Sequence, residues 1–201
     1  MVEIKAELVK KLRERSGVGM MECKKALSEA SGDMSKAELI LRERGLASAS
    51  KKSNRTTNQG LIESYIHPGS KIGVLLEVNS ETDFVARNEQ FKDLVHNIAL
   101  HIAAAAPTYV SSDDVPADVL ESEKEIYKKQ ALNEGKPDAV LEKIAEGRIK
   151  KFYQENCLMD QLYVKDNDVT IGDLVKQSIA KIGENIVVRR FCRFVLGEEI
   201  R

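Results

Sequence analysis

Apolar residues recur at helical spacing along the first 45 residues of the chain. Ile4, Leu8 and Leu12 are four residues apart and share one stripe of a helix. The sequence SGVG interrupts this stripe, and Gly45 is placed to stop a later helix at its C-terminus. The pattern predicts three short helices, at residues 3–15, 20–30 and 34–44. Three helices of this length form a minimal bundle, which suits a small docking domain.

Strand-like and helical segments alternate in the next part of the chain. Two runs rich in β-branched and aliphatic residues, Leu61–Ile66 and Ile72–Val78, flank the turn sequence HPGS and predict a β-hairpin. An apolar stripe then predicts a long helix that begins after Asn88 and ends before Pro107. Two charged helices with thin apolar stripes, within residues 117–156, predict an antiparallel helical hairpin that projects from the body.

The C-terminal segment contains two more predicted strands and one helix. A strand at Gln161–Lys165 leads into a turn at Asp166–Asp168, and Thr170 is a suitable N-cap for the helix that follows. The last strand, Asn185–Leu196, reads NIVVRRFCRFVL and carries apolar residues on both faces. That pattern is typical of a central strand or of a strand that also meets a second subunit.

The predicted fold class is therefore α+β: an N-terminal three-helix bundle, then an antiparallel β-sheet core with helices on one side and a projecting helical hairpin. We expect a docking domain at residues 1–46, a linker at residues 47–60, and a core and dimerisation domain at residues 61–201. The linker, ASASKKSNRTTNQG, is small, polar and basic, which favours a solvated tether.

The segment between the β-hairpin and the long helix, NSETDFVARNEQF, is the least ordinary in the chain. It places Thr82, Asp83, Phe84 and Val85 at a strand-to-helix corner, where small polar residues are usual. Phe84 at such a corner is either packed under the following helix or held out for a partner. In the second interpretation Phe84 is a wedge and Asp83 is its polar companion.

Composition and charge favour a docking protein over other classes. The first 60 residues contain 13 Lys or Arg and 8 Asp or Glu, whereas the remainder contains 18 and 24, so a mildly basic third precedes an acidic body. A dedicated nucleic-acid binder would be more basic. Cys23, Cys157 and Cys192 do not form a disulfide framework, and no apolar run is long enough to span a membrane. We expect a cytoplasmic protein that does not bind membranes.

No set of residues in the sequence has the spacing of a catalytic or metal site. The chain contains neither a GxxxxGK[ST] phosphate loop nor a GxGxxG motif, and its histidines are not spaced as metal ligands with cysteines or carboxylates. Asp83 lacks a clear partner carboxylate for acid–base chemistry. We therefore expect no enzyme activity, no cofactor and no bound metal, because the unusual residues are those suited to contact.

Three passages together resemble one protein family: LRERSGVGMMECKKALSEASGD at residues 12–33, TDFVARN at residues 82–88, and KIGENIVVRRF at residues 181–191. On these passages the chain resembles translation elongation factor Ts, the guanine-nucleotide exchange factor for elongation factor Tu. The resemblance extends from the first helix to the last strand. It implies that the N-terminal bundle is UBA-like (ubiquitin-associated type) and docks on the GTPase domain of elongation factor Tu.

The resemblance also implies roles for particular residues. The segment Thr82–Val85 matches the family segment that displaces the nucleotide-bound Mg²⁺ of elongation factor Tu, with Asp83 and Phe84 as the intruding pair. The residues that match the docking surface are Arg13, Met20, Met21, Lys24, Ile182 and Gly183. Two adjacent methionines cannot share one helical face, so at least one of them is expected to be exposed for a partner. The alternative is that both pack in the bundle, because Met adapts well to irregular cores.

One departure from longer family members concerns the core. Those members carry the core unit twice in one chain, whereas this sequence has it once. It therefore resembles the short form, which implies a homodimer through the core sheet, with the last strand and Cys192 at the seam. The alternative is an RNA-associated translation protein without exchange activity, although we expect no direct nucleic-acid binding. Its candidate contacts are Lys51, Lys52, Arg55, Arg189, Arg190 and Arg193.

Overall fold

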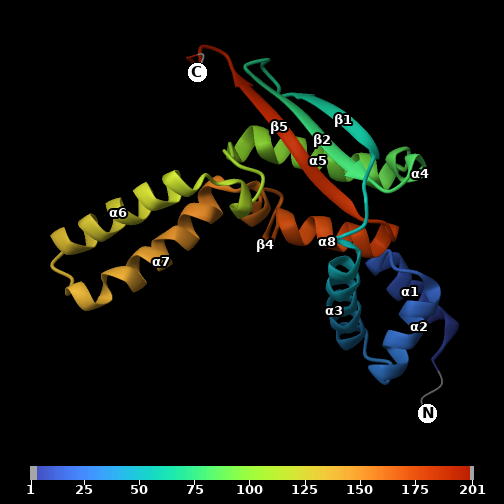
Figure 1. Cartoon of the computed structure of the whole chain (residues 1–201). Coiled ribbons are helices and arrows are strands. Elements are labelled where there is room, and N and C mark those ends of the chain that lie inside the picture. The colour runs from blue at the N-terminus through green and yellow to red at the C-terminus, as the bar shows by residue number, and fades with distance from the viewer. Residues whose placement is uncertain (1–3, 200–201) are drawn as a thin grey trace. The chain divides into compact units, whose positions relative to one another are not determined.

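A computed structural model describes residues 4–199 and confirms the α+β class (Figure 1). The chain divides into two compact units, and elements of the core contribute to both. The first unit comprises the residues up to Leu61, Val78–Val95 and Leu174–Val187. The second comprises Ile62–Glu77, His96–Asp173 and the residues from Val188 onward. In residues 4–199 no helix has the length and apolarity that crossing a bilayer requires.

The predicted three-helix bundle is present in the first unit. It consists of α1 (Ala6–Ser16), α2 (Met20–Glu29) and α3 (Met34–Lys52). Helix α1 ends at Gly17, which adopts the left-handed conformation with φ 68° that glycine tolerates best. The Asp33 carboxylate caps α3 by accepting a hydrogen bond from the Lys36 amide at 3.0 Å. The shared core contains Val9, Leu12, Cys23, Ala26, Leu27, Ala30, Ala37 and Leu41.

Helix α3 is longer than predicted, and the prediction that Gly45 stops it is wrong. The helix continues to Lys52, so the first residues of the predicted linker are helical. Gly45 has a packing role instead, because a Cβ built on it would lie 2.9 Å from the Cβ of Ala180. Ala180 belongs to α8 (Ile171–Ile182), so Gly45 lets α3 and α8 approach closely.

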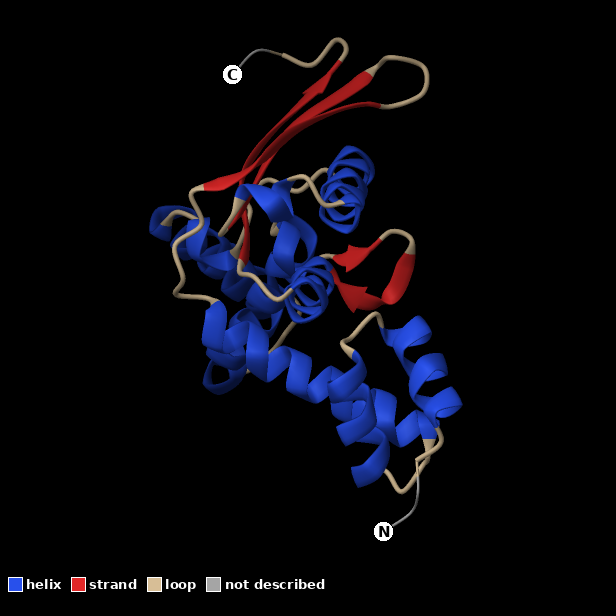
Figure 2. Cartoon of the chain, turned by 90° about the vertical axis from the view of Figure 1, so that its right-hand side faces the viewer, coloured by secondary structure: helices blue, strands red, loops and turns tan. Residues whose placement is uncertain are grey.

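The core sheet has three strands in the order β1 (Gln59–Ile66), β2 (Ile72–Ser80) and β5 (Ile186–Val195). The predicted hairpin is confirmed, with the His67 amide donating to the Ile72 carbonyl at 2.9 Å. Strand β5 lies at one edge of the sheet, so the interpretation of β5 as a central strand is wrong. Figure 2 shows the three strands side by side, apart from the short two-stranded sheet.

Helix α5 (Glu89–Ala105) lies along one face of the sheet (Figure 1). Glu63 of β1 contacts His96 at 3.0 Å, and Arg193 of β5 donates to the Ala103 carbonyl at 3.2 Å. The residues next to these two on their strands, Ile62 and Ser64 on β1 and Cys192 and Phe194 on β5, point the other way and are exposed. The apolar members of that open face are Ile62, Ile66, Leu75, Phe194 and Leu196, which are 50% to 75% exposed. Cys192 lies on β5, two residues before Phe194, and is also exposed.

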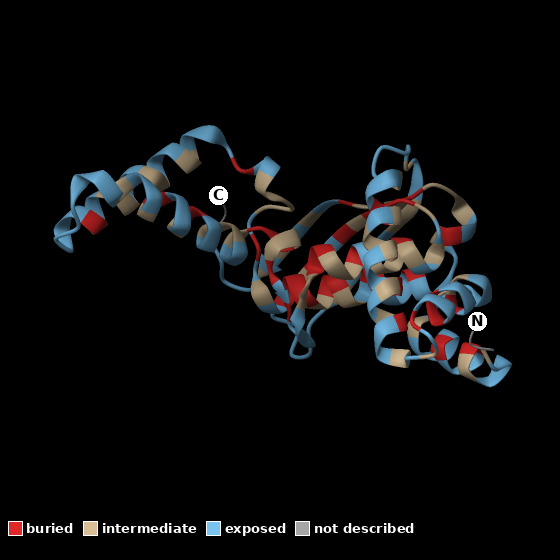
Figure 3. Cartoon of the chain, turned by 90° about the horizontal axis from the view of Figure 1, so that it is seen from below, coloured by how far each residue is buried: buried red, intermediate tan, exposed pale blue. Residues whose placement is uncertain are grey.

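The predicted helical hairpin is formed by α6 (Ala117–Asn133) and α7 (Asp138–Asn156), which pack against each other. Arg148 of α7 donates to Gln130 at 2.7 Å and to Glu134 at 2.8 Å across this contact. Most of both helices is exposed (Figure 3), as expected for a hairpin that projects from the core. The buried residues on the two helices are Ala131, Ala145 and Ile149.

Two short segments differ from prediction in the second unit. The strand predicted at Gln161–Lys165 is only β3 (Leu162–Tyr163), and it pairs with β4 (Asp166–Thr170), where a turn was expected. Two 3₁₀ turns, Ser112–Asp114 and Leu158–Asp160, complete the described elements. The cap by Thr170 is confirmed, since its hydroxyl accepts from the Asp173 amide at 3.1 Å.

His101 of α5 is fully buried in the second unit. The Val164 amide donates to its Nδ1 at 3.3 Å, so the proton of the neutral ring is on Nε2. That Nε2 lies 2.9 Å from Oε1 of Gln161 and donates to it. Burial lowers the pKa of His101, an effect that the Gln161 hydrogen bond partly opposes. This histidine is therefore a satisfied core residue that links α5 to the β3 region.

Candidate partner interface

The corner after β2 is a single helical turn, α4 (Asp83–Ala86). Thr82 precedes it in extended conformation, and its hydroxyl accepts from the Val85 amide at 3.5 Å, as an N-cap does. Asn88 then starts α5, with its side-chain oxygen accepting from the Gln90 amide at 2.8 Å. Two caps within seven residues therefore turn the chain sharply from strand to helix.

Phe84 and Val85 point in opposite directions from this turn. Val85 is 8% exposed and anchors the corner, whereas Phe84 is 81% exposed, the most of any large apolar residue in the described part of the chain. The interpretation of Phe84 as a buried corner residue is therefore wrong for this conformation. A Phe ring held almost entirely in water has its apolar surface available to a partner.

Asp83 lies beside Phe84 and forms an ion pair with Arg87 at 2.9 Å. The carboxylate side chain is 47% exposed and the arginine side chain is 78% exposed. Exposed pairs one helical turn apart contribute little stability, so a partner can replace Arg87 at small cost. Asp83 is thus placed to form a hydrogen bond on a bound protein next to the aromatic ring.

Thr82 fixes the corner to the loop that follows α8. Its amide donates to the Glu184 carboxylate at 3.0 Å, and its hydroxyl donates to the same carboxylate at 2.7 Å. Gly183 precedes Glu184 with φ 93°, a conformation that favours glycine, and it ends α8. Ile182 is half-buried and Gly183 is exposed. These two predicted contact residues directly precede Glu184, which holds the corner.

The four residues expected to dock from the bundle are all exposed. Met20 is 44% exposed and Met21 is 68% exposed, which confirms the expectation that at least one of the two methionines is accessible. Met21 and Lys24 line a shallow hollow on the surface of α2. Arg13 lies on α1 and is exposed as well. The bundle therefore offers flexible apolar side chains beside positive charge, which suits a partner surface.

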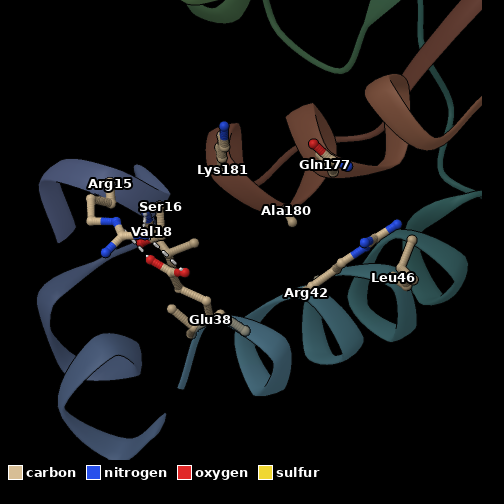
Figure 4. A pocket seen from close by; sticks show the side chains of 11 residues that line it. Arg15, Ser16, Val18, Glu38, Arg42, Leu46, Gln177, Ala180 and Lys181 are labelled. Atoms are coloured by element: carbon tan, nitrogen blue, oxygen red, sulfur yellow. Dashed lines mark hydrogen bonds and ion pairs between the residues drawn. The ribbon is translucent and has the colours of Figure 1, made fainter. Parts of the chain in front are cut away.

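A cavity of about 240 Å³ lies between the bundle and α8 within the first unit (Figure 4). Arg15 and Glu38 form an ion pair at 2.8 Å on its wall. Ala180 of α8 lies between that pair and Arg42, and Leu46 of α3 lies beyond Arg42. The sequence did not predict this cavity, because Gly45 was interpreted as a helix stop and not as a close approach of two helices.

The cations proposed for RNA binding are partly used within the chain. Arg55 pairs with Glu81 at 3.4 Å, and Arg190 pairs with Glu77 at 2.7 Å. Arg193 donates to the Ala103 carbonyl. Three of the six candidate contacts therefore have partners within the chain, although the two ion pairs are exposed. Within residues 4–199, no three His, Cys, Asp or Glu side chains gather as a metal site would require.

Comparison with known proteins identifies the family. The family model described as "Elongation factor TS" matches residues 48–198. Proteins named Elongation factor Ts from Thermoanaerobacter sp. (strain X514) and Moorella thermoacetica are 60% and 59% identical, each over 98% of this chain and 97% of their own length. The protein of the same name from Coprothermobacter proteolyticus is 59% identical over 98% of this chain and 100% of its own length. The chain belongs to the elongation factor Ts family of translation factors.

Proposed function

We propose that this chain is a guanine-nucleotide exchange factor that binds elongation factor Tu in its GDP form and promotes GDP release in the cytoplasm. The observation that carries this proposal is the corner at Thr82–Val85. It holds Phe84 81% exposed on a capped turn that is anchored by buried Val85. Family membership supports the elongation role, and the exposed ring supports the way in which it is performed.

The mechanism is displacement without covalent chemistry. The affinity of a GTPase for its nucleotide depends on a Mg²⁺ ion that bridges phosphate oxygens and on donors placed around the phosphates. Insertion of Phe84 moves the elements that hold this ion, so Mg²⁺ leaves and GDP follows. Asp83 exchanges Arg87 for a donor on the partner and fixes where the ring enters. Exchange factor and nucleotide then lower each other's affinity by the same factor.

Docking uses two surfaces, one from residues that precede the corner in the sequence and one from residues that follow it. The exposed Met20 and Met21, with Arg13 and Lys24, bind the GTPase domain and bring the corner to it. Ile182 and Gly183 add a contact beside the residue that holds Thr82. The N-terminal bundle accordingly acts as the UBA-like docking domain, and affinity comes mostly from these surfaces rather than from the ring.

The open face of the sheet forms a homodimer in this proposal. The apolar residues on this face come from all three strands or directly follow them, and each is at least half exposed: Ile62, Ile66, Leu75, Phe194 and Leu196. A second copy of the chain would cover this face. Cys192 lies on the same strand as Phe194 and is exposed, which supports a position at the seam.

The experiment is stopped-flow release of a fluorescent GDP analogue from elongation factor Tu, with and without the chain, in millimolar Mg²⁺ and in excess chelator. We expect strong acceleration in Mg²⁺ and a much smaller one in chelator, where the ion is already gone. Equal acceleration in both conditions would exclude Mg²⁺ displacement. No acceleration in either condition would exclude the exchange function itself.

A further inference from the structure

Two carboxylates cross-link the corner and the loop after α8 in opposite directions. Glu184, in the loop, accepts hydrogen bonds from the amide and hydroxyl of Thr82 at 3.0 and 2.7 Å. Glu81, at the corner, accepts a hydrogen bond from the Asn185 amide at 2.6 Å. Each segment therefore supplies a charged acceptor to a backbone donor of the other, and charged acceptors form the stronger hydrogen bonds.

Glu81 and Asn185 also bind the segment that follows α3, by which the chain leaves the bundle. The Asn185 side chain is 2% exposed, and its amide donates to the Ser53 carbonyl at 3.2 Å and the Arg55 carbonyl at 2.9 Å. Arg55 in turn contacts the Glu81 carboxylate at 3.4 Å. This part of the predicted linker is therefore bonded to the core, and its interpretation as a solvated tether is wrong there.

Thr82 is held at each of its polar groups, while the side chain two residues later is free. Its carbonyl accepts from the hydroxyl of fully buried Ser80 at 2.9 Å, in addition to the bonds to Glu184. Its hydroxyl also accepts from the Val85 amide. The base of the corner is thus fixed from several directions, whereas the ring of Phe84 has no such restraint.

We propose that Glu81, Glu184 and Asn185 are positioning residues that hold the corner carrying Phe84 in a set place relative to the bundle exit and the Gly183 loop. This inference rests on the proposed function. A corner that is already ordered in the free chain loses little conformational entropy when the ring enters a partner. More of the interaction free energy is then left for displacing the ion. The cluster also fixes the corner relative to two docking surfaces, so docking and insertion occur in one orientation.

The test combines hydrogen exchange with kinetics on Glu184→Ala. We expect the amides of residues 80–87 in the free protein to exchange about tenfold faster or more, because the variant loses both hydrogen bonds to a charged acceptor. The maximal rate of GDP release at saturating exchange factor should fall by a similar factor. The concentration that gives half of the maximal rate should stay within about twofold, because the docking surfaces are unchanged.

Two further variants separate positioning from general damage to the fold. Glu184→Gln keeps one of the two acceptor oxygens and should recover part of both effects. Thr82→Val removes the hydroxyl, with its bond to Glu184 and its weak cap on the Val85 amide, but keeps the amide bond to Glu184, so it should give a smaller loss than Glu184→Ala. Glu142→Ala removes an exposed carboxylate that pairs with Lys128 in the helical hairpin, and it should change neither measurement. If Glu184→Ala fails to fold, the Thr82→Val and Glu184→Gln pair carries the test.

Phe84→Ala measured in parallel distinguishes failure of this inference from failure of the proposed function. If Phe84→Ala loses stimulation while Glu184→Ala keeps it, the positioning role is wrong and the exchange function stands. If Phe84→Ala keeps full stimulation, the proposed function of the corner is wrong whatever Glu184 does. Unchanged exchange of residues 80–87 in Glu184→Ala would also overturn the positioning role.

Discussion

Replacing Phe84 with alanine should separate action on the partner from folding, because the ring is 81% exposed. Complete burial of a Phe side chain contributes about 1.5 to 3 kcal/mol. About a fifth of that stabilises the free chain, so the free energy of unfolding should fall by roughly 0.3 to 0.6 kcal/mol, or about 1 to 2 °C in Tm. The remainder, roughly 1.2 to 2.4 kcal/mol, is available to a partner and corresponds to about 8- to 60-fold slower stimulated GDP release.

The assay is stopped-flow release of a fluorescent GDP analogue, with the thermal unfolding of each variant measured beside it. Leu132→Ala is a matched control, since it truncates an apolar side chain that is 53% exposed in the helical hairpin, and it should leave release unchanged. Phe91→Ala removes a fully buried ring and should cost about 3 to 5 kcal/mol of stability. Release by Phe84→Ala within twofold of wild type would refute the account of the ring as a wedge.

Three other predictions follow from the described contacts. Phe194→Lys places a charge on the open sheet face and should convert the proposed homodimer to a monomer in light scattering; an unchanged mass would argue against that seam. Because the pKa of His101 is lowered in the folded chain, the unfolded chain binds a proton first as the pH falls. The contribution of neutral His101 to stability is therefore complete above pH 6.5 and is lost as the pH falls below that value. Urea unfolding from pH 8 to pH 5.5 should show this loss of stability, and His101→Gln should reduce the loss. Gly45→Ala should destabilise the chain by about 1 to 3 kcal/mol through crowding against Ala180, and Ala180→Gly should restore part of it; purely additive effects would contradict the close approach of α3 and α8.

Local patterns predicted the elements whose signals are local. Helices α2, α6 and α7 were expected from apolar stripes and turn residues, and the structure places them within the predicted segments. The cap at Thr170 was predicted for the same reason, since a cap bonds to amides two or three residues away. Resemblance to the family added the residues of the corner and of the docking surface, which periodicity alone does not mark.

The features that the sequence did not predict depend on distant residues. Gly45 has the appearance of a helix stop until Ala180 is placed against it. The exposure of Phe84 depends on Val85 taking the buried side of the turn, and residue type alone favours burial for both. Glu184 and Asn185 lie about a hundred residues from their hydrogen-bond partners at the corner, so the hydropathy pattern does not predict these hydrogen bonds.

Photocrosslinking from position 84 tests the central claim most directly, because it asks where the exposed ring goes. Phe84 is replaced by benzoylphenylalanine, which keeps an aromatic ring at the tip, and the chain is irradiated with elongation factor Tu bound to GDP. The account predicts a crosslink to the GTPase domain close to its nucleotide site, and none from the same probe at Leu132. Absence of a crosslink from position 84, under conditions where position 21 does crosslink, would contradict insertion of the ring.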